Sequence, residues 1–273
     1  MFVFQRLYDR LGFRDRLILV EAFVLGLGGI AASRVLFPDH AGLVSVFLAG
    51  FAAVDTLQRL LERNRDDIWQ RGHGSYHANE RLAFSILAMF TGFLGAYALV
   101  AMAVPLESVD GLFGPQLMPF RGRTSADLVL PGFLPLLGHN LLVMIAGFLA
   151  ALIYREGGIL LVLGWNASLW GAVFPAMARR AAPGGAVHAV AELARLLPGI
   201  LPHLLLESLA YVLVAMAGVF LSRGLLRHRA GSPELRRVLA ASLSTAGLAL
   251  LTLLAACAWE SQVSIRVLDR LAR

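Results

Sequence analysis

Hydrophobic residues along this chain are collected into long, nearly uninterrupted runs, without the mixed polar and apolar pattern of a water-soluble domain. Each run is roughly 20 residues long, the length that a helix needs to cross the hydrocarbon core of a membrane. The pattern predicts an all-α, polytopic transmembrane helical bundle that forms a single domain over residues 1–273. The seven expected membrane-spanning segments are 17–37, 42–61, 82–104, 132–154, 157–178, 200–222 and 238–260.

The first sixteen residues differ from these spans because their apolar side chains recur at helical spacing between arginines. This pattern is typical of a short amphipathic helix in the membrane interface, and we predict one over residues 1–16. The apolar positions are Phe4, Leu7, Tyr8 and Leu11. A cleavable signal peptide is the alternative, since Ala31-Ala32-Ser33 follows an apolar run, but the long basic leader and the equally apolar next segment favour a retained anchor.

The amino-acid composition is typical of a membrane protein, and we do not expect nucleic acid to be a partner. Charged residues make up 15% of the chain, against roughly 25% in soluble domains, and the mean hydropathy is +0.71. The net charge is +6, and every one of the 24 basic residues is an arginine. Most of these arginines lie beside apolar runs, where the positive-inside rule explains them.

The distribution of arginines predicts the orientation of the bundle. Four arginines precede the first span, four lie in loop 62–81 and five lie in 223–237, whereas the alternate loops hold fewer. This bias places the N-terminus in the cytoplasm, and we expect the membrane to be a bacterial cytoplasmic (inner) membrane. The arginines of the C-terminal tail then fall outside, against the rule.

Three loops carry further expectations. The Pro- and Gly-rich loop 105–131 either caps the bundle from outside or is a disordered connector. Loop 183–199 contains a helical piece that we expect along the membrane surface. Loop 62–81 carries His73 and His77, and we expect a solvated loop there in preference to a metal site, because two glycines weaken its helix.

Sequence motifs exclude several classes of enzyme. The chain has no GxxxxGK[ST], GxGxxG, HExxH or GxSxG pattern, so a role in a pump would need another subunit to supply the energy. The single cysteine, Cys257, allows no intramolecular disulfide and no multi-cysteine metal site. We interpret it as a packing residue.

Polar side chains inside the predicted spans are informative, because each is costly in hydrocarbon unless it is paired or functional. In the second half these residues are His139, Asn140, Asn166, His203, Glu207 and Glu260. Successive spans run antiparallel, so we expect four of these side chains to meet near the external face of the membrane. They are His139, His203, Glu207 and Glu260. Glu21 and Asp55 fall toward the opposite face. A re-entrant segment 157–178 would reverse the direction of the following span.

Two histidines and two carboxylates are suitable ligands for Zn²⁺, which takes nitrogen and oxygen donors in four-coordinate sites. The interpretation we favour is structural, with these groups and the asparagines bonding helices together. A metal or proton-handling site is the second interpretation, and a pocket for a lipid headgroup or substrate is the third. In an enzyme, Glu207 or Glu260 would act as the catalytic base toward a metal-bound water.

The order of small and polar residues over 138–260 resembles the stage II sporulation protein M family, also called SpoIIM or DUF95. The matching positions are Gly138-His139-Asn140, Gly147, Leu163-Gly164-Trp165-Asn166, Leu201-Pro202-His203, Glu207, Gly218 and Glu260. Ala167 and Leu204 depart from the family pattern, which has glycine at both positions. The resemblance implies a polytopic membrane scaffold that recruits other envelope proteins, and it implies no catalytic residue.

These observations lead to three hypotheses about function. The first is a scaffold or subunit of a cell-envelope or transport complex, in contact with the lipid bilayer and with other membrane proteins or copies of itself. The alternative is an intramembrane metal-dependent hydrolase that uses the His/Glu cluster. The second alternative is a permease subunit in which the same polar groups line a path.

Overall fold

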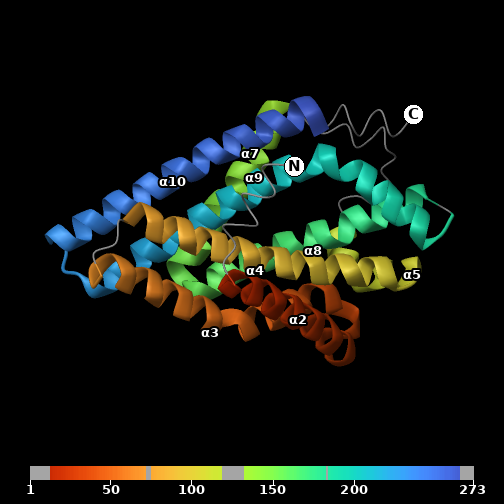
Figure 1. Ribbon diagram of the computed structural model, residues 1–273, viewed down its shortest axis with the longest axis horizontal. Helices are drawn as coiled ribbons and strands as arrows, with labels where there is room; N and C mark the ends of the chain where they lie inside the picture. Colours follow the sequence, from red (N-terminus) through yellow and green to blue (C-terminus); the bar gives the residue numbers. More distant parts are fainter. Residues whose placement is uncertain (1–12, 72–74, 119–131, 183, 265–273) are drawn as a thin grey trace.

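The computed structural model describes residues 13–71, 75–118, 132–182 and 184–264, and in these ranges the chain is helical without strands (Figure 1). Seven of the helices are long and apolar enough to cross a membrane. They are α2 (Phe13–Leu36), α3 (Ala41–Trp69), α4 (Ser75–Ala103), α7 (Phe133–Tyr154), α8 (Glu156–Ala181), α9 (Ala186–Arg227) and α10 (Pro233–Trp259). The short elements are η1 (Pro38–His40), α5 (Leu106–Leu112), α6 (Gly114–Leu117) and a terminal π-helical turn, η3 (Glu260–Ser264). The prediction of a seven-span helical bundle is therefore confirmed, whereas the interfacial helix expected over 1–16 lies mostly outside the described residues.

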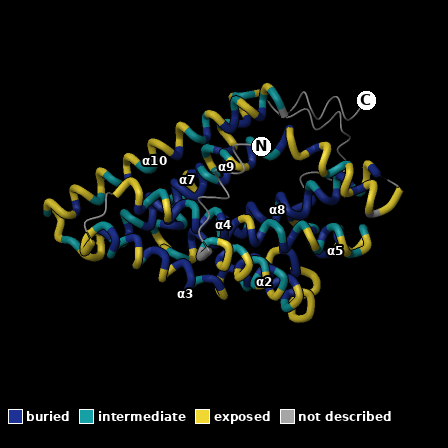
Figure 2. Tube along the Cα trace, in the orientation of Figure 1, coloured by how far each residue is buried: buried dark blue, intermediate teal, exposed yellow. Residues whose placement is uncertain are grey.

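The core of the bundle is formed around α8 and α9, the two most buried helices (Figure 2). Helix α9 packs against α7, α8 and α10, and α4 links α8 to α2. Tyr97 and Tyr211 are among the largest fully buried side chains. Helix α10 is the least buried span and contacts mainly α9.

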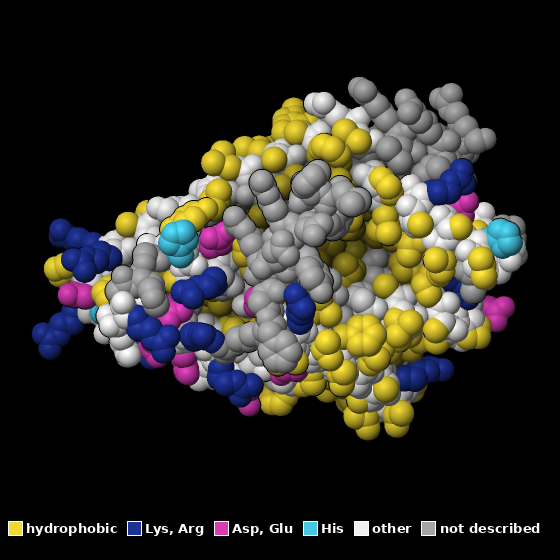
Figure 3. All heavy atoms as spheres, in the orientation of Figure 1, with side chains coloured by type: hydrophobic (Ala, Val, Ile, Leu, Met, Phe, Trp, Pro, Cys, Tyr) yellow, Lys and Arg dark blue, Asp and Glu magenta, His cyan; other side chains and the backbone are white. Residues whose placement is uncertain are grey.

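Large apolar side chains remain exposed along the middle of several helices (Figure 3). Phe51 is 82% exposed, Leu243 72% and Leu142 68%. A water-soluble protein rarely leaves so much contiguous apolar surface open, whereas lipid solvates such a surface without cost. The chain is an integral, multi-pass membrane protein.

The charged segment 62–81 is mostly helical, so the prediction of a loop there is wrong. Helix α3 continues to Trp69 and α4 begins at Ser75. The two helices are joined at this end by the Asn64 Nδ2 to Asn79 Oδ1 hydrogen bond (3.0 Å) and by Asp67. His77 is exposed on α4, 3.7 Å from Glu80, while His73 lies outside the described residues.

The surface helix predicted within 183–199 is the first part of α9, which runs unbroken for 42 residues. At 1.5 Å per residue its length is roughly 63 Å, about twice the hydrocarbon thickness. Pro198 and Pro202 lie inside this helix, where each removes one backbone hydrogen bond. Proline is tolerated within membrane helices because neighbouring groups satisfy the freed carbonyls, so these residues do not end α9.

The segment after α4 forms α5 and α6 and caps the bundle over residues 106–117. For these residues the expectation of a cap is confirmed and that of a disordered connector is wrong. Val109, Phe113 and Leu117 are buried in the core. Gln116 donates its amide to the carbonyl of Gly42 (2.9 Å) and to Ser168 Oγ (3.2 Å), so α6 bridges α3 and α8. The rest of the predicted loop lies outside the described residues.

The connection between α7 and α8 fixes their antiparallel arrangement. Arg155, with φ 52°, is the one non-glycine residue at positive φ in the described part of the chain. Glycine is required nearby at Gly158, because a Cβ atom there would lie 2.2 Å from the carbonyl oxygen of Ala150. Helix α8 continues as one helix of 26 residues, which is long and apolar enough for a full crossing.

Candidate functional site

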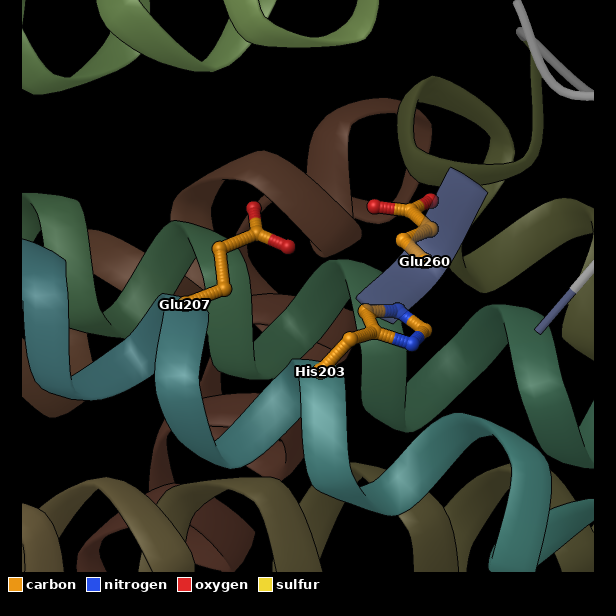
Figure 4. A group of neighbouring side chains, drawn as sticks. All are labelled: His203, Glu207 and Glu260. Carbon is orange, nitrogen blue, oxygen red and sulfur yellow. The ribbon is translucent and has the colours of Figure 1, made fainter. Parts of the chain in front are cut away.

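Three of the polar side chains singled out from the sequence meet between α9 and the end of α10. His203 and Glu207 lie on α9, and Glu260 is the first residue of the π-helical turn η3. Each of the three offers a ligand atom within 4.8 Å of the other two. Figure 4 shows the carboxylates of Glu207 and Glu260 turned toward one another, with the imidazole of His203 beside Glu260. We call these three residues the HEE cluster.

Local structure explains how residues so far apart in sequence come together. His203 and Glu207 are one helical turn apart, so both side chains project from the same side of α9. Helix α10 runs back antiparallel along α9, which brings its C-terminal end to the middle of the longer helix. Glu260 begins the π-helical turn there, and such turns are often found at functional sites.

The HEE cluster is buried. His203 is 6% exposed, Glu207 8% and Glu260 7%. Glu207 Oε1 accepts a hydrogen bond from the hydroxyl of Tyr211 (2.8 Å). Within the described part of the chain, no arginine forms an ion pair with either carboxylate, and Glu260 has no hydrogen-bond partner for its carboxylate.

The two buried carboxylates of the HEE cluster lie close together, and no described arginine lies between them. Two carboxylates held this close in a low-dielectric environment cannot both be ionised unless a cation lies with them. Protons could neutralise them one at a time, but a divalent cation would neutralise both and would use the imidazole nitrogen as a further ligand. Imidazole and carboxylate are donors that Zn²⁺ accepts.

His139 is not part of the cluster, so the expectation that it joins the other three is wrong. It lies on α7 with an exposed side chain, whereas its neighbour Asn140 is buried. Consecutive residues of a helix point about 100° apart, so α7 can turn only one of the two inward. Asn140 takes the inward position and donates to Cys257 Sγ at 3.7 Å, next to the cluster.

The remaining candidates also lie apart from the HEE cluster. Asn166 donates to the carbonyl of Val162 on its own helix (2.8 Å), which makes it a local contact of α8. Glu21 accepts from Thr56 Oγ1 (2.5 Å) and joins α2 to α3, and Asp55 is exposed. As predicted, these two acidic residues belong to a different part of the bundle.

Tyr211 is a contributor to the site that the sequence analysis did not select. Its hydroxyl is the one described hydrogen-bond donor to Glu207, and its ring is 2% exposed. The available signal was its spacing, because Tyr211 follows Glu207 by four residues and so lies on the same helix face.

Comparison with known proteins adds no identification. No protein-family model, no curated protein and no solved structure matches this chain. The resemblance to the stage II sporulation protein M family therefore stays a prediction from the residues at 138–260.

Proposed function

We propose that this protein binds a divalent cation of the zinc class at the HEE cluster, and that the metal holds the end of α10 against the middle of α9. The observation that carries the proposal is the convergence of three buried donor side chains within 4.8 Å. Two buried carboxylates without an arginine, in the part of the chain that is described, can both stay ionised only if positive charge lies with them, and an ion with charge +2 would supply it. A divalent cation would also use all three donor groups at once, which protonation of the carboxylates would not do.

In this proposal the bound metal serves a membrane scaffold or a subunit of a cell-envelope or transport complex. Helix α10 supports that role because it is held mainly by α9 and presents Leu243, Leu248 and Leu251 outward. A second protein, a second copy of this chain or lipid can cover that face. A sporulation-protein-M-type scaffold, the first hypothesis from the sequence, has the same requirement for a fixed outer surface.

Metal titration tests the proposal. The purified, chelator-stripped protein is titrated with zinc against a chromophoric competitor, and we expect one site per chain. His203→Ala removes one of three ligands, and its affinity should fall by more than about 100-fold, since even outer-shell changes cost 10–100-fold. His139→Ala is the matched control and should bind as the wild type does, because its side chain faces outward.

Two results would contradict the metal site. One is a wild-type protein that takes up no zinc, cobalt or manganese in a folded state. The other is an equal loss of binding in the two histidine variants, which would indicate a non-specific effect. Glu207→Gln provides a second variant, with nearly the same volume, should His203→Ala fail to fold.

An intramembrane metal-dependent hydrolase is the second candidate, and the number of ligands favours it. Three protein ligands leave one position of a four-coordinate ion open for water, as in catalytic zinc sites. Cobalt substitution separates the two candidates. If the position is open, azide or a hydroxamate should change the visible spectrum of the cobalt protein, and an unchanged spectrum would support the structural role.

A further inference from the structure

A cavity of about 630 Å³ lies at the start of α10, whereas the HEE cluster lies at the other end of that helix. It is formed where α3 ends and α4 begins, and where α9 ends and α10 begins. Arginine side chains gather at this end of the molecule (Figure 3). The volume is within the range of roughly 300–1,000 Å³ that is usual for small-molecule sites.

The polar part of the lining is strongly basic. Four arginines line the cavity together with His228, and no acidic residue is among the lining residues described. Arg65 is paired with Asp66 at 2.6 Å, and Arg223 is paired with Glu156. Arg227 and Arg237 form no ion pair with the described residues, so their charge is available to a ligand.

The lining also contains Asn64, Ser75 and Asn79, and the remaining residues are mostly apolar. They include Leu61, Ile68, Phe220, Val238 and Ala241. The ring of Trp69 lies beside that of His228, with centroids 6.0 Å apart. A lining that combines arginines with apolar side chains suits a ligand that is itself an amphiphile with an anionic head.

Helices α9 and α10 approach closely at the floor of the cavity. A Cβ atom on Gly224 would lie 2.6 Å from Val238 Cγ1, so only glycine allows this approach. The approach sets the ends of α9 and α10 side by side, and these ends carry Arg227 and Arg237 into one cavity. Two guanidinium groups on separate helices can bind one phosphate with several charge-assisted hydrogen bonds.

We propose that this cavity binds an anionic phospholipid, with the phosphate on Arg227 and Arg237 and an acyl chain along Phe220 and Val238. Basic pockets between membrane helices at the interface are the usual sites for such headgroups. The shared chemistry is a phosphate group, so a soluble phosphate compound is the other source that the experiment must distinguish. This inference does not depend on the metal site.

Lipid binding to the full-length protein in detergent tests the proposal. The probes are short-chain phosphatidylglycerol, short-chain phosphatidylcholine and inorganic phosphate, with binding followed by native mass spectrometry. The variant is Arg227→Gln with Arg237→Gln. The matched control is Arg229→Gln with Arg236→Gln, which makes the same change in net charge at exposed positions outside the cavity lining.

We expect phosphatidylglycerol to bind the variant roughly 25-fold more weakly than the wild type, at about fivefold for each basic residue. The control should change by less than about twofold, because its arginines contribute only to the screened general field. Equal weakening in the two double variants would overturn the site, as would equal affinity of the wild type for phosphatidylcholine. Inorganic phosphate that binds as tightly as the lipid would overturn the lipid and assign the cavity to a soluble phosphate compound.

A second measurement keeps the proposal testable if the variant does not fold. Brominated phosphatidylglycerol should quench the fluorescence of Trp69 in the wild type more strongly than brominated phosphatidylcholine does. The difference should disappear in Trp69→Phe, whose remaining tryptophans do not line the cavity. Equal quenching by the two lipids would contradict a site selective for the anionic headgroup.

Discussion

Among the residues that the structure describes, buried carboxylates occur at two places, at the junction of α3 with α4 and at the contact of α9 with α10. At the first, Asp67 is 5% exposed and accepts from Arg71 (3.0 Å) and from Arg81 (3.1 Å), so each carboxylate oxygen has a cationic partner. At the second, Glu207 and Glu260 are buried to a similar extent and have only Tyr211 as a described donor. The two arginines of the first site reach water, since each is more than half exposed.

The difference distinguishes a buried carboxylate that the protein itself neutralises from buried carboxylates that can bind a cation. Asp67 is neutralised by the protein itself, and its role as a link between two helices is complete. The HEE cluster is left with a deficit of positive charge that a divalent cation can fill. Three substitutions test this comparison.

Glu260→Gln should have the largest effect, because it removes a metal ligand from α10. With zinc at 1,000 times its dissociation constant, binding stabilises the wild type by about 4 kcal/mol, and the variant should lose most of that. Thermal unfolding in detergent, with zinc and with a chelator, measures the loss. A variant that zinc stabilises as much as the wild type would show that Glu260 is not a ligand.

Asp67→Asn should destabilise the protein by about 2 kcal/mol, since it weakens two charge-assisted hydrogen bonds whose arginines are largely hydrated. The loss should be the same with zinc and with the chelator, because this site is complete without a metal. The same unfolding experiment provides the measurement. If Asp67→Asn destabilised the protein by different amounts with zinc and with the chelator, the two regions would not differ as proposed.

Tyr211→Phe should have the smallest effect on stability and a selective effect on the metal. The hydroxyl orients the Glu207 carboxylate through its 2.8 Å hydrogen bond, and the loss of such an outer contact lowers metal affinity by about tenfold. Competition titration with zinc measures this change. Unaltered affinity would make Tyr211 a packing residue only.

The sequence predicts the spans and the meeting of distant residues better than it predicts which way a side chain faces. Hydropathy locates all seven helices, and antiparallel crossing correctly brings His203 and Glu207 to Glu260. His139 could not be placed, because a membrane helix is apolar both toward lipid and toward the core, so the pattern of hydrophobic residues does not show which face of α7 is inward. The buried face of α7, which includes Leu136, Asn140 and Met144, shows that rotation only in the structure.

The ends of the helices are harder to predict from the sequence than the membrane-spanning segments. The charged residues in 62–81 predict a loop between two spans, because charge opposes burial of a helix in lipid. In the structure the charged residues continue α3 beyond the apolar run and are paired across to α4 through Asp67. Such pairing between distant residues is a tertiary effect that no local pattern shows.

A metal ion at the contact of α9 with α10 is the central feature proposed for this bundle. X-ray absorption at the zinc edge on the purified, zinc-loaded protein measures its ligands. We predict one zinc per chain, with one imidazole nitrogen at about 2.0 Å and carboxylate oxygens at about 2.0–2.2 Å, and loss of the nitrogen in His203→Ala. A spectrum of fully hydrated zinc, or one that is identical in His203→Ala, would contradict it.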